Sequence, residues 1–311
     1  MIERQQKSLK SLFAGTLLFN ETMKRHTTFG IGGNVSCFAY PENTLDLSNI
    51  IKFAKSESIR IFFIGSGSNL LVSDDGFDGI IISLHKMNHS LTLTENTYTC
   101  GSGLILSSFV KDTIKHQFTG LENLSGIPGT LGGAIFMNAG AYGTEISQNL
   151  IKLTSMDIEG NIHHYTKNEI DFSYRNSSIS DNEIIIESTF IFEKGDINEI
   201  NDRKQIALYN RKSSQPLNFR SAGSVFKNSS GSSAGYLIDQ AGLKGKSIGG
   251  AVVSEKHANF IVNINNASSN DVINLIKAVY QKVLHDFSIK LELEIKLLGF
   301  VDSQLNGFIH V

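Results

Sequence analysis

The 311-residue sequence contains no tryptophan, only three prolines and only two cysteines. The cysteines, Cys37 and Cys100, are too few for the disulfide framework that small secreted proteins use. No Cys-x-x-Cys motif and no cluster of histidine and cysteine has the spacing of metal ligands. We therefore expect a protein of the reducing cytoplasm that holds no metal ion.

Long apolar runs and an excess of basic charge are missing as well. No segment approaches the roughly 18 consecutive apolar residues that a transmembrane helix needs. The net charge of −2 provides no basic surplus for binding nucleic acid through its phosphates. Because 41% of the residues are apolar, intrinsic disorder is excluded. The length predicts about two folded domains, at roughly 150 residues per domain.

The N-terminal segment has some features of a signal peptide, because three basic residues precede a short apolar run. Gly15 and Thr16 interrupt that run, and no small-residue cleavage pattern follows it. Apolar positions instead recur at helical spacing, at Leu9, Leu12, Phe13, Thr16 and Leu17. The pattern favours an amphipathic helix docked on the protein, which we assign to residues 1–22.

The remaining pattern mixes helices with strands. Short apolar runs rich in branched residues predict strands at Ile61–Ile64, Ile80–Ile82, Ile184–Ile186 and Phe260–Ile264. Helical spacing is found at Leu45–Ser56, at Asn201–Lys212 and after the capping box that Ser268 begins. Strict alternation of apolar and charged residues over 289–297 predicts a half-buried strand. The composition changes near residues 200–220, so we expect one domain over 23–200 and another over 201–311.

The 28 glycines are concentrated in a few loops. One cluster, Gly65-Ser66-Gly67-Ser68-Asn69, directly follows the predicted strand Ile61–Ile64, and six glycines lie within residues 126–143. Glycine lets successive backbone N–H groups face one anion, so two such loops could hold a pyrophosphate. For the first cluster, an ordinary tight turn is an equally good interpretation.

Two common nucleotide-binding motifs are absent. The dinucleotide fingerprint requires glycine where Leu70 stands, and the P-loop that would end at Gly245-Lys246-Ser247 requires glycine where Gln240 stands. In the second half, Ser224 lies between Arg220 and Lys227 but lacks the glycine spacing of a hydrolase nucleophile. Proton donation fits this serine better than acyl transfer, although an ordinary strand serine also explains it. The residue patterns alone thus predict a domain that holds a phosphate group, but they do not identify a reaction.

Taken together, the motifs resemble the UDP-N-acetylenolpyruvoylglucosamine reductases of bacterial peptidoglycan synthesis. The resemblance covers roughly residues 20–300, and the combination is far more specific than any single motif. The motifs occur in this order: Thr27-Thr28-Phe29-x-Ile31-Gly32-Gly33, Gly65-x-Gly67-Ser68-Asn69, Gly126-Ile127-Pro128-Gly129-x-x-Gly132-Gly133, Phe172-x-Tyr174-Arg175-x-Ser177, Ala222-Gly223-Ser224-x-Phe226-Lys227-Asn228, Gly242-Leu243-Lys244-Gly245 and Leu291-Glu292-x-Glu294-Ile295.

The resemblance implies an α+β fold with two domains. The first is an FAD-binding domain of the vanillyl-alcohol-oxidase (PCMH) type, in two subdomains divided near residues 85–90. The second is a C-terminal α+β substrate-binding domain whose last strand returns to the active site. It implies that NADPH reduces bound FAD. Reduced FAD would then reduce UDP-N-acetylglucosamine enolpyruvate to UDP-N-acetylmuramate. It further implies a cytoplasmic enzyme of cell-wall biogenesis that works as a monomer on a small-molecule substrate.

The resemblance also implies roles for individual residues. The catalytic residues would be Ser224 as the proton donor, with Arg175 and Glu294 acting on the substrate carboxylate and the enol-like intermediate. The flavin would lie against Gly65, Ser66, Gly67, Ser68, Asn69, Ser125, Gly126, Ile127, Pro128, Gly129, Gly132 and Gly133. Substrate contacts would come from Tyr142, Arg220, Asn228, Lys244 and His257.

Two features vary within the family. This chain has Glu294-Ile295-Lys296 where many relatives have Glu-Val-Arg, a change that keeps the glutamate. Only 45 positions separate Arg175 from Arg220, which indicates the subgroup without an inserted loop that carries a substrate-binding tyrosine. Two other functions remain open: a different FAD-dependent oxidase or dehydrogenase of the same superfamily, and a UDP-sugar-binding module without catalysis.

Overall fold

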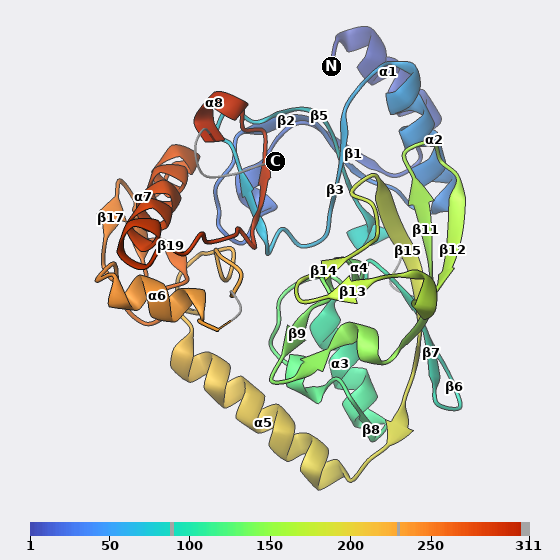
Figure 1. Ribbon diagram of the computed structural model, residues 1–311. Helices are drawn as coiled ribbons and strands as arrows, with labels where there is room; N and C mark the ends of the chain where they lie inside the picture. The colour runs from blue at the N-terminus through green and yellow to red at the C-terminus, as the bar shows by residue number, and fades with distance from the viewer. Residues whose placement is uncertain (88–89, 229–230, 306–311) are drawn as a thin grey trace. The chain divides into compact units, whose positions relative to one another are not determined.

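The computed structural model describes residues 1–87, 90–228 and 231–305 (Figure 1). Its helices are α1 (Glu3–Leu12), α2 (Thr44–Ser56), α3 (Leu106–Lys115), α4 (Leu131–Phe136), α5 (Ile197–Ser214), α6 (Ala234–Gln240), α7 (Ser269–Phe287) and α8 (Asp302–Leu305). Its strands are β1 (Thr16–Thr22), β2 (Asn34–Tyr40), β3 (Ile61–Ile64), β4 (Leu70–Val72), β5 (Phe77–Ser83), β6 (Leu91–Thr94), β7 (Thr97–Gly101), β8 (Phe118–Thr119), β9 (Gly140–Ala141), β10 (Thr144–Glu145), β11 (Leu150–Asp157), β12 (Ile162–Thr166), β13 (Phe172–Ser173), β14 (Asn176–Ser177), β15 (Glu183–Ile191), β16 (Glu193–Lys194), β17 (Ser247–Ile248), β18 (Ala251–Val253), β19 (Ile261–Asn263) and β20 (Lys296–Leu298).

The chain forms two compact units, each assembled from separate stretches of sequence. The first unit comprises residues 1–20, 36–66 and 78–211. The second comprises residues 21–35, 67–77 and the chain from 212 onward. The second unit therefore draws two short stretches from the first quarter of the sequence. The subdomain boundary predicted near 85–90 includes residues 88 and 89, which lie outside the described residues.

Within the first unit, α1 and α2 pack together against a sheet of order β1-β2-β5-β3, most of which belongs to this unit (Figure 1). Strands β3 and β5 are parallel. Four predictions for this region are confirmed: the helix over 45–56, the strands at 61–64 and 80–82, and a docked N-terminal helix. The shared core is apolar, with Leu9, Phe13, Leu47, Ile50, Ile51, Ile80 and Ile82 buried in it.

The N-terminal helix is shorter than predicted, since α1 ends at Leu12 and residues 16–22 form strand β1. The buried carboxylate of Asp46 causes this change of direction. It accepts hydrogen bonds from the backbone N–H groups of Ala14 and Gly15, both at 2.9 Å, and of Glu42 at 3.0 Å. A side chain on Gly15 would collide with Tyr40 O. The prediction that Thr16 and Leu17 belong to the N-terminal helix is therefore wrong.

The first unit also contains a five-stranded antiparallel sheet of order β12-β11-β15-β7-β6. Helices α3 and α4 contribute to its core, in which Tyr98 meets the rings of Phe109, Phe118 and Phe192 edge-on at 5.5 to 5.9 Å between centroids. Such edge-to-face contacts add specific geometry to apolar burial. The strand predicted at 184–186 is confirmed as part of β15.

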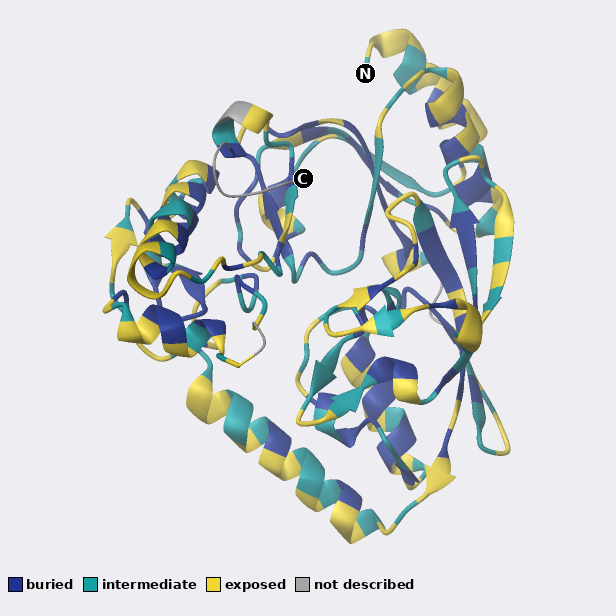
Figure 2. Ribbon diagram, viewed as in Figure 1, coloured by how far each residue is buried: buried dark blue, intermediate teal, exposed yellow. Residues whose placement is uncertain are grey.

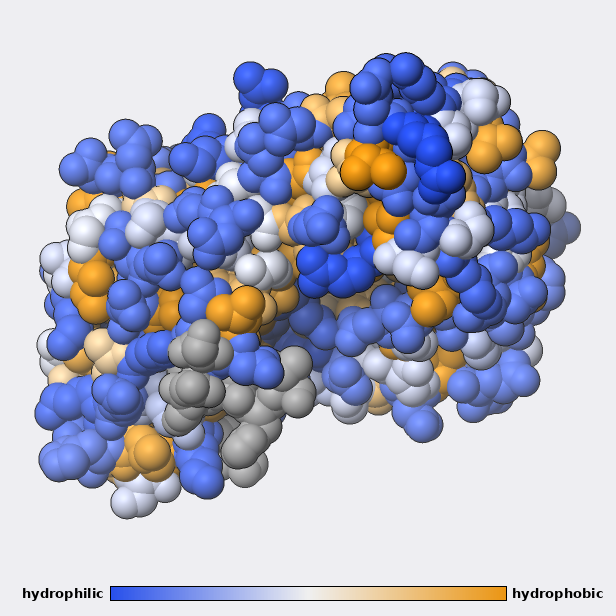
Figure 3. All heavy atoms as spheres, turned by 90° about the horizontal axis from the view of Figure 1, so that it is seen from above, coloured by the Kyte–Doolittle hydropathy of each residue, from blue (hydrophilic) through white to orange (hydrophobic). Residues whose placement is uncertain are grey.

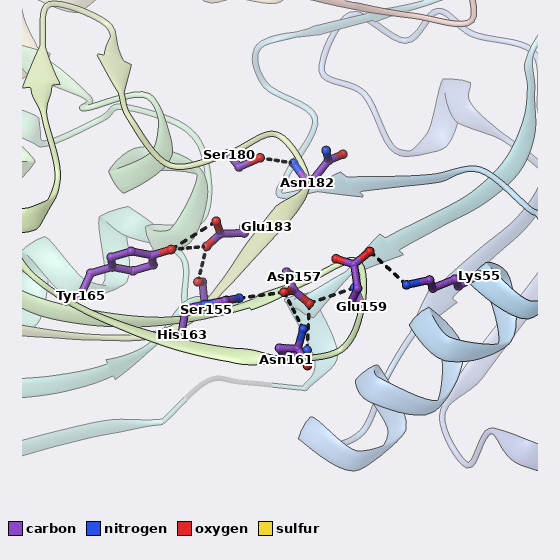
Figure 4. A network of polar contacts seen from close by, with 10 residues as sticks. All are labelled: Lys55, Ser155, Asp157, Glu159, Asn161, His163, Tyr165, Ser180, Asn182 and Glu183. Atoms are coloured by element: carbon purple, nitrogen blue, oxygen red, sulfur yellow. Dashed lines mark hydrogen bonds and ion pairs between the residues drawn. The ribbon is translucent and has the colours of Figure 1, made fainter.

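A polar network lies on the β11–β12 hairpin (Figure 4). Asp157 accepts a hydrogen bond from His163 Nε2 at 2.8 Å and two more from Asn161. Next to it, Glu183 accepts hydrogen bonds from Ser155 and Tyr165. The hydrogen bond to Asp157 raises the pKa of His163 above its ordinary 6.5.

Within the second unit, α6 and α7 pack on the antiparallel sheet β17-β18-β19, and β20 pairs with β4 in parallel (Figure 1). The predicted capping box is confirmed, because Ser268 and Asp271 satisfy each other's backbone N–H groups at the start of α7. Its predicted apolar stripe is buried at Val272, Leu275, Ile276, Val279 and Val283. The strand predicted at 260–264 is confirmed as β19.

The strand predicted over 289–297 is mostly absent, because only β20 is regular. The predicted alternation of burial nevertheless holds in part: Leu291 and Ile295 are buried, whereas Glu292 and Lys296 are exposed. This segment stays extended but crosses from one partner to another. Leu293 pairs with Phe226 in an isolated bridge, and β20 then pairs with β4.

Helix α5 extends the helix predicted over 201–212, and most of its surface is exposed (Figure 2). Near its start, Arg203 Nε donates a hydrogen bond of 2.6 Å to the buried carboxylate of Glu122. Glu122 also accepts from Gly120 N and Thr119 Oγ1. An ion pair with such additional hydrogen bonds attaches the exposed helix to the first unit.

Hydrophilic side chains cover most of the surface visible in Figure 3, and apolar side chains appear there in small separate groups. Among the helices that the structure describes, none is both long enough and apolar enough to cross a membrane.

We predict that Asp46→Ala destabilises the protein. Losing one carboxylate leaves three backbone N–H groups without their acceptor, and we expect the free energy of unfolding to fall by about 1–3 kcal/mol. Urea denaturation followed by circular dichroism measures this change. Asp202→Ala, which removes an exposed carboxylate on α5, is the control and should leave the unfolding midpoint in place. Equal midpoints for the two variants would contradict the role of Asp46.

We also predict a pH-dependent contribution from His163. Because its pKa is higher in the folded than in the unfolded state, its contribution is full below the unfolded value and is lost as the pH rises through the folded value. The stability difference between wild type and His163→Gln should therefore be larger at about pH 5.5 than at about pH 9. Denaturation at both pH values measures the difference, and a difference that grows with pH would refute the assignment.

Candidate active site

The predicted flavin loop of the first unit, Ser125–Gly133, ends in the first turn of α4. Backbone hydrogen bonds fix it to the segment before α3: Leu106 N donates to Gly129 O at 3.0 Å and Leu131 N to Leu104 O at 2.7 Å. Ser125 is buried, whereas Gly126, Pro128 and Gly133 are exposed. The loop is thus held firmly while part of its backbone stays accessible.

Gly65, at the end of β3, approaches this loop closely. A Cβ on Gly65 would lie 2.5 Å from Thr130 Oγ1, and a Cβ on Gly132 would lie 2.8 Å from Ser102 Cβ. The Thr130 hydroxyl caps α4 by accepting a hydrogen bond from Gly133 N at 3.3 Å. The structure therefore brings Gly65 to the loop, as two glycine segments that hold one ligand require, and Ser66 follows it in the chain.

Two hydroxyl groups in this region suit a polar ligand. Ser102 Oγ and Ser125 Oγ are buried and have no hydrogen-bond partner among the described residues. A buried hydroxyl without a partner costs free energy, and such groups are frequent at ligand sites. A flavin nucleotide offers both donors and acceptors, so the residues present fit FAD.

The other predicted flavin residues, Gly67, Ser68 and Asn69, belong to the second unit. Gly67 has a φ of +63°, and a side chain there would collide with the carbonyl of His26. Thr28 N donates to Gly67 O at 3.1 Å, so the Thr-Thr-Phe motif fixes this turn. The Asn69 side chain donates to Glu294 O at 2.9 Å, which joins the predicted flavin segment to the predicted catalytic glutamate.

Backbone pairing brings Glu294 close to the segment of Ser224. Glu294 N donates to Val225 O, and Lys227 N donates to Glu292 O, both at 2.8 Å. Ser224 itself forms an isolated bridge with Phe260. Of the three predicted catalytic residues, Ser224 and Glu294 thus lie on paired segments of the second unit, whereas Arg175 belongs to the first unit.

Sequence reasoning missed Asn259, which holds the serine segment in place. Its side chain is 3% exposed and makes two hydrogen bonds with the backbone of Phe226, accepting at 3.0 Å and donating at 2.7 Å. The sequence offers no signal for Asn259, because only its burial shows that the amide must be hydrogen-bonded.

The predicted substrate contacts of the second unit, Arg220, Asn228, Lys244 and His257, lie outside its helices. Arg220 is exposed, and its guanidinium lies against Gly30. Asn228 Oδ1 accepts from Ala234 N at 3.0 Å at the start of α6. Lys244 Nζ forms an ion pair with Asp239 at 2.7 Å. Asn228 and Lys244 are therefore held in place at the two ends of α6.

His257 is partly buried, and burial is the main cause that lowers its pKa, with a smaller contribution from the positive charge of Lys244. Asn259 N donates to His257 Nδ1 at 3.3 Å. The ring is then neutral at pH 7 with its proton on Nε2, which makes Nε2–H a hydrogen-bond donor. The ring stands over Gly235 of α6, whose Cβ position is 3.3 Å from His257 Cε1.

Tyr142 and Arg175 occupy the turns of two short hairpins in the first unit. Tyr142 lies between β9 and β10 with φ of +52°, and Arg175 between β13 and β14 with φ of +55°. Residues other than glycine seldom adopt this conformation, and such strain is common at functional sites. Arg211, which sequence reasoning also missed, lies against Gly126 of the flavin loop, and burial lowers its pKa.

Comparison with known proteins agrees with this geometry. Residues 215–298 match the model of the UDP-N-acetylenolpyruvoylglucosamine reductase C-terminal domain, and residues 35–166 match that of an FAD binding domain. The UDP-N-acetylenolpyruvoylglucosamine reductase of Caldanaerobacter subterraneus subsp. tengcongensis is 42% identical over 301 residues, covering 96% of this chain and 98% of that protein. The enzyme of the same name from Clostridioides difficile is 41% identical over 281 residues, covering 90% and 92%.

A solved structure gives the same result for the fold. The crystal structure of UDP-N-acetylenolpyruvylglucosamine reductase from Thermus caldophilus superposes with a TM-score of 0.77 at 31% identity, covering 91% of this chain and 98% of that one. The family resemblance and the fold class predicted from the sequence are confirmed. The chain belongs to the UDP-N-acetylenolpyruvoylglucosamine reductases, a family of FAD-dependent oxidoreductases.

Proposed function

We propose that the protein reduces UDP-N-acetylglucosamine enolpyruvate to UDP-N-acetylmuramate, with NADPH as the reductant and FAD as the bound cofactor, in the synthesis of peptidoglycan precursors. The observation that carries this proposal is the link from Asn69 to Glu294 and from Glu294 to Val225. It joins a flavin-segment residue, the proposed catalytic glutamate and the neighbour of the proposed proton donor within one unit.

FAD, when bound, supplies the hydride chemistry by taking a hydride from NADPH and passing it to the substrate double bond. Gly65, Ser66 and the loop Ser125–Gly133 would hold it in the first unit, with Gly67, Ser68 and Asn69 doing so in the second. The unpartnered hydroxyls of Ser102 and Ser125 support this assignment. The glycines allow backbone N–H groups to approach the pyrophosphate without interference from side chains.

Three side chains would carry the chemistry on the substrate. Hydride addition next to a carboxylate builds negative charge, which a nearby cation and hydrogen-bond donors stabilise. Arg175 would bind the carboxylate, and Glu294 would help to stabilise the enol-like intermediate. Ser224 would protonate the carbon next to the carboxylate, and a serine needs such surroundings to act as an acid. The bridge to Phe260 and the amide of Asn259 support a fixed position for the serine segment.

Recognition of the substrate would rest on Tyr142, Arg220, Asn228, Lys244 and His257. A pyrophosphate carries negative charge, which the two cations Arg220 and Lys244 would offset. The neutral His257 would add a single N–H donor, and its lowered pKa keeps it in this state across the neutral range. We further propose that the enzyme acts as a monomer in the cytoplasm.

Ser224→Ala should separate the two half-reactions. We expect unchanged FAD content and an unchanged rate of flavin bleaching by NADPH. Flavin reoxidation by the enolpyruvyl UDP-sugar should slow by roughly 10²- to 10⁴-fold, the usual contribution of a general acid. Anaerobic stopped-flow absorbance measures both rates. Equal losses in both half-reactions would argue against proton donation, and a colourless wild-type protein that binds no FAD would refute the proposed function itself.

Gly65→Ala should lower the FAD content, because the added methyl group would push Thr130 from its capping position. The bound flavin is measured by absorbance after desalting, together with the thermal midpoint as a check on folding. Removing the obstructing hydroxyl in Gly65→Ala/Thr130→Ala should recover FAD content above that of the single variant. A double variant with less flavin than Gly65→Ala would show that the close contact is not the cause.

A further inference from the structure

Asn138 lies at a central position between two hairpins of the first unit. It follows α4 directly, is fully buried and has a φ of +42°. Its Nδ2 group donates one hydrogen bond to Ser173 O at 3.0 Å and another to Glu145 Oε2 at 2.8 Å. One amide group therefore contacts two separate hairpins.

Those two hairpins carry residues of the proposed active site. Ser173 ends β13, and the next two residues, Tyr174 and Arg175, form the turn to β14. Glu145 belongs to β10, which the turn at Tyr142 and Gly143 joins to β9. Asn138 is thus hydrogen-bonded directly to the strand that precedes Arg175 and to the strand that follows Tyr142.

Neither hairpin is long enough to hold its turn unaided. Each consists of two residues paired with two others: Phe172 with Ser177 and Ser173 with Asn176 in one, Thr144 with Ala141 and Glu145 with Gly140 in the other. An isolated hairpin is only marginally stable in water even when it is longer. Both turns also contain a residue at positive φ, which costs further free energy. Contacts from outside the hairpins must supply the missing stabilisation.

The end of α4 provides these contacts. Besides the Asn138 amide, Phe136 O accepts a hydrogen bond of 2.7 Å from the buried hydroxyl of Ser177, on the other strand of the Arg175 hairpin. The hairpin is therefore attached to α4 on both strands. Asparagine suits position 138 for two reasons: it tolerates positive φ better than most residues, and its amide can donate twice, which a carboxylate cannot.

We propose that Asn138 is a positioning residue that acts through Arg175, by holding the Arg175 turn in the geometry that the reduction of the substrate requires. This inference rests on the proposed function, because it takes the catalytic role of Arg175 from there. The link to Glu145 extends the same positioning to the turn of Tyr142.

The primary variant is Asn138→Gly, because glycine keeps the positive φ while removing the amide. We expect FAD content and bleaching by NADPH to match wild type. Flavin reoxidation by the enolpyruvyl UDP-sugar should slow by roughly 10- to 100-fold, the loss expected from a misplaced catalytic group. In the Arg175→Ala background, Asn138→Gly should cause little further loss, because both substitutions remove the same contribution.

Hydrogen exchange of the FAD-bound enzyme gives a readout independent of catalysis. Backbone amides of residues 173–177 should exchange faster in Asn138→Gly than in wild type. Asn123→Ala is the matched control, because the Asn123 amide donates to Thr144 of the Tyr142 hairpin alone. It should leave exchange at residues 173–177 unchanged.

These measurements separate failure of the inference from failure of the proposed function. If Arg175→Ala leaves reoxidation unchanged, the proposed role of Arg175 fails, whatever the exchange data show. Unchanged exchange and unchanged reoxidation in Asn138→Gly overturn the inference, and so does a loss that adds fully to that of Arg175→Ala. Asn138→Asp keeps the size and the positive φ but loses the donors, and it should reproduce both effects. Loss of FAD and of folding in both variants would show a general folding role and likewise overturn the inference.

Discussion

The parallel pairing of β4 with β20 is the constraint on which the second unit depends. Leu70, Leu71 and Val72 pair with Lys296, Leu297 and Leu298, and the link between Asn69 and Glu294 spans 225 positions of sequence. Closing a loop of that length costs chain entropy, which burial of the surrounding apolar side chains offsets. Because Glu294 lies two residues before this pairing begins, the register of a few backbone hydrogen bonds also fixes the glutamate beside the proposed flavin segment.

Glycine permits a close approach of the backbone in each of the two units. Gly67 sits where the carbonyl of His26 leaves no space for a side chain, and Gly65 sits beside the hydroxyl of Thr130. In both places the backbone packs so closely against a neighbouring residue that only glycine fits. Backbone N–H groups recognise a pyrophosphate well, so the concentration of glycine in these loops agrees with the proposed binding of FAD there.

Local patterns in the sequence predict the helices and strands that are stabilised by residues close to them in the sequence. Helix α7 has its cap and its apolar stripe in adjacent residues, and β3 is a short β-branched run before a glycine turn, so both were predictable. The end of α1 depends on Asp46, more than thirty positions away, and no local pattern contains that information. Apolar and charged residues alternate over 289–297 as a strand requires. The segment nevertheless pairs first with Phe226 and then with β4, so it forms a regular strand only at its end.

The residues around the candidate site also differ in whether the sequence predicts them. The family motifs lead to Arg175, Ser224 and Glu294 as the proposed catalytic residues, because the proposed chemistry restricts which residue types can stand there. They do not identify the residues that hold these side chains in position. Asn138 and Asn259 are ordinary polar residues in the sequence, and only their burial shows that their amides have a task.

The two buried asparagines perform related tasks in the two units. Asn259 uses both its donor and its acceptor on the backbone of Phe226, two residues after Ser224. Asn138 donates to Glu145 and to Ser173, and Ser173 lies two residues before Arg175. In each case a proposed catalytic residue lies on a segment with little regular pairing of its own, where a general acid or a cation needs a defined position. A buried amide supplies that position, because leaving its N–H donors without acceptors would cost free energy.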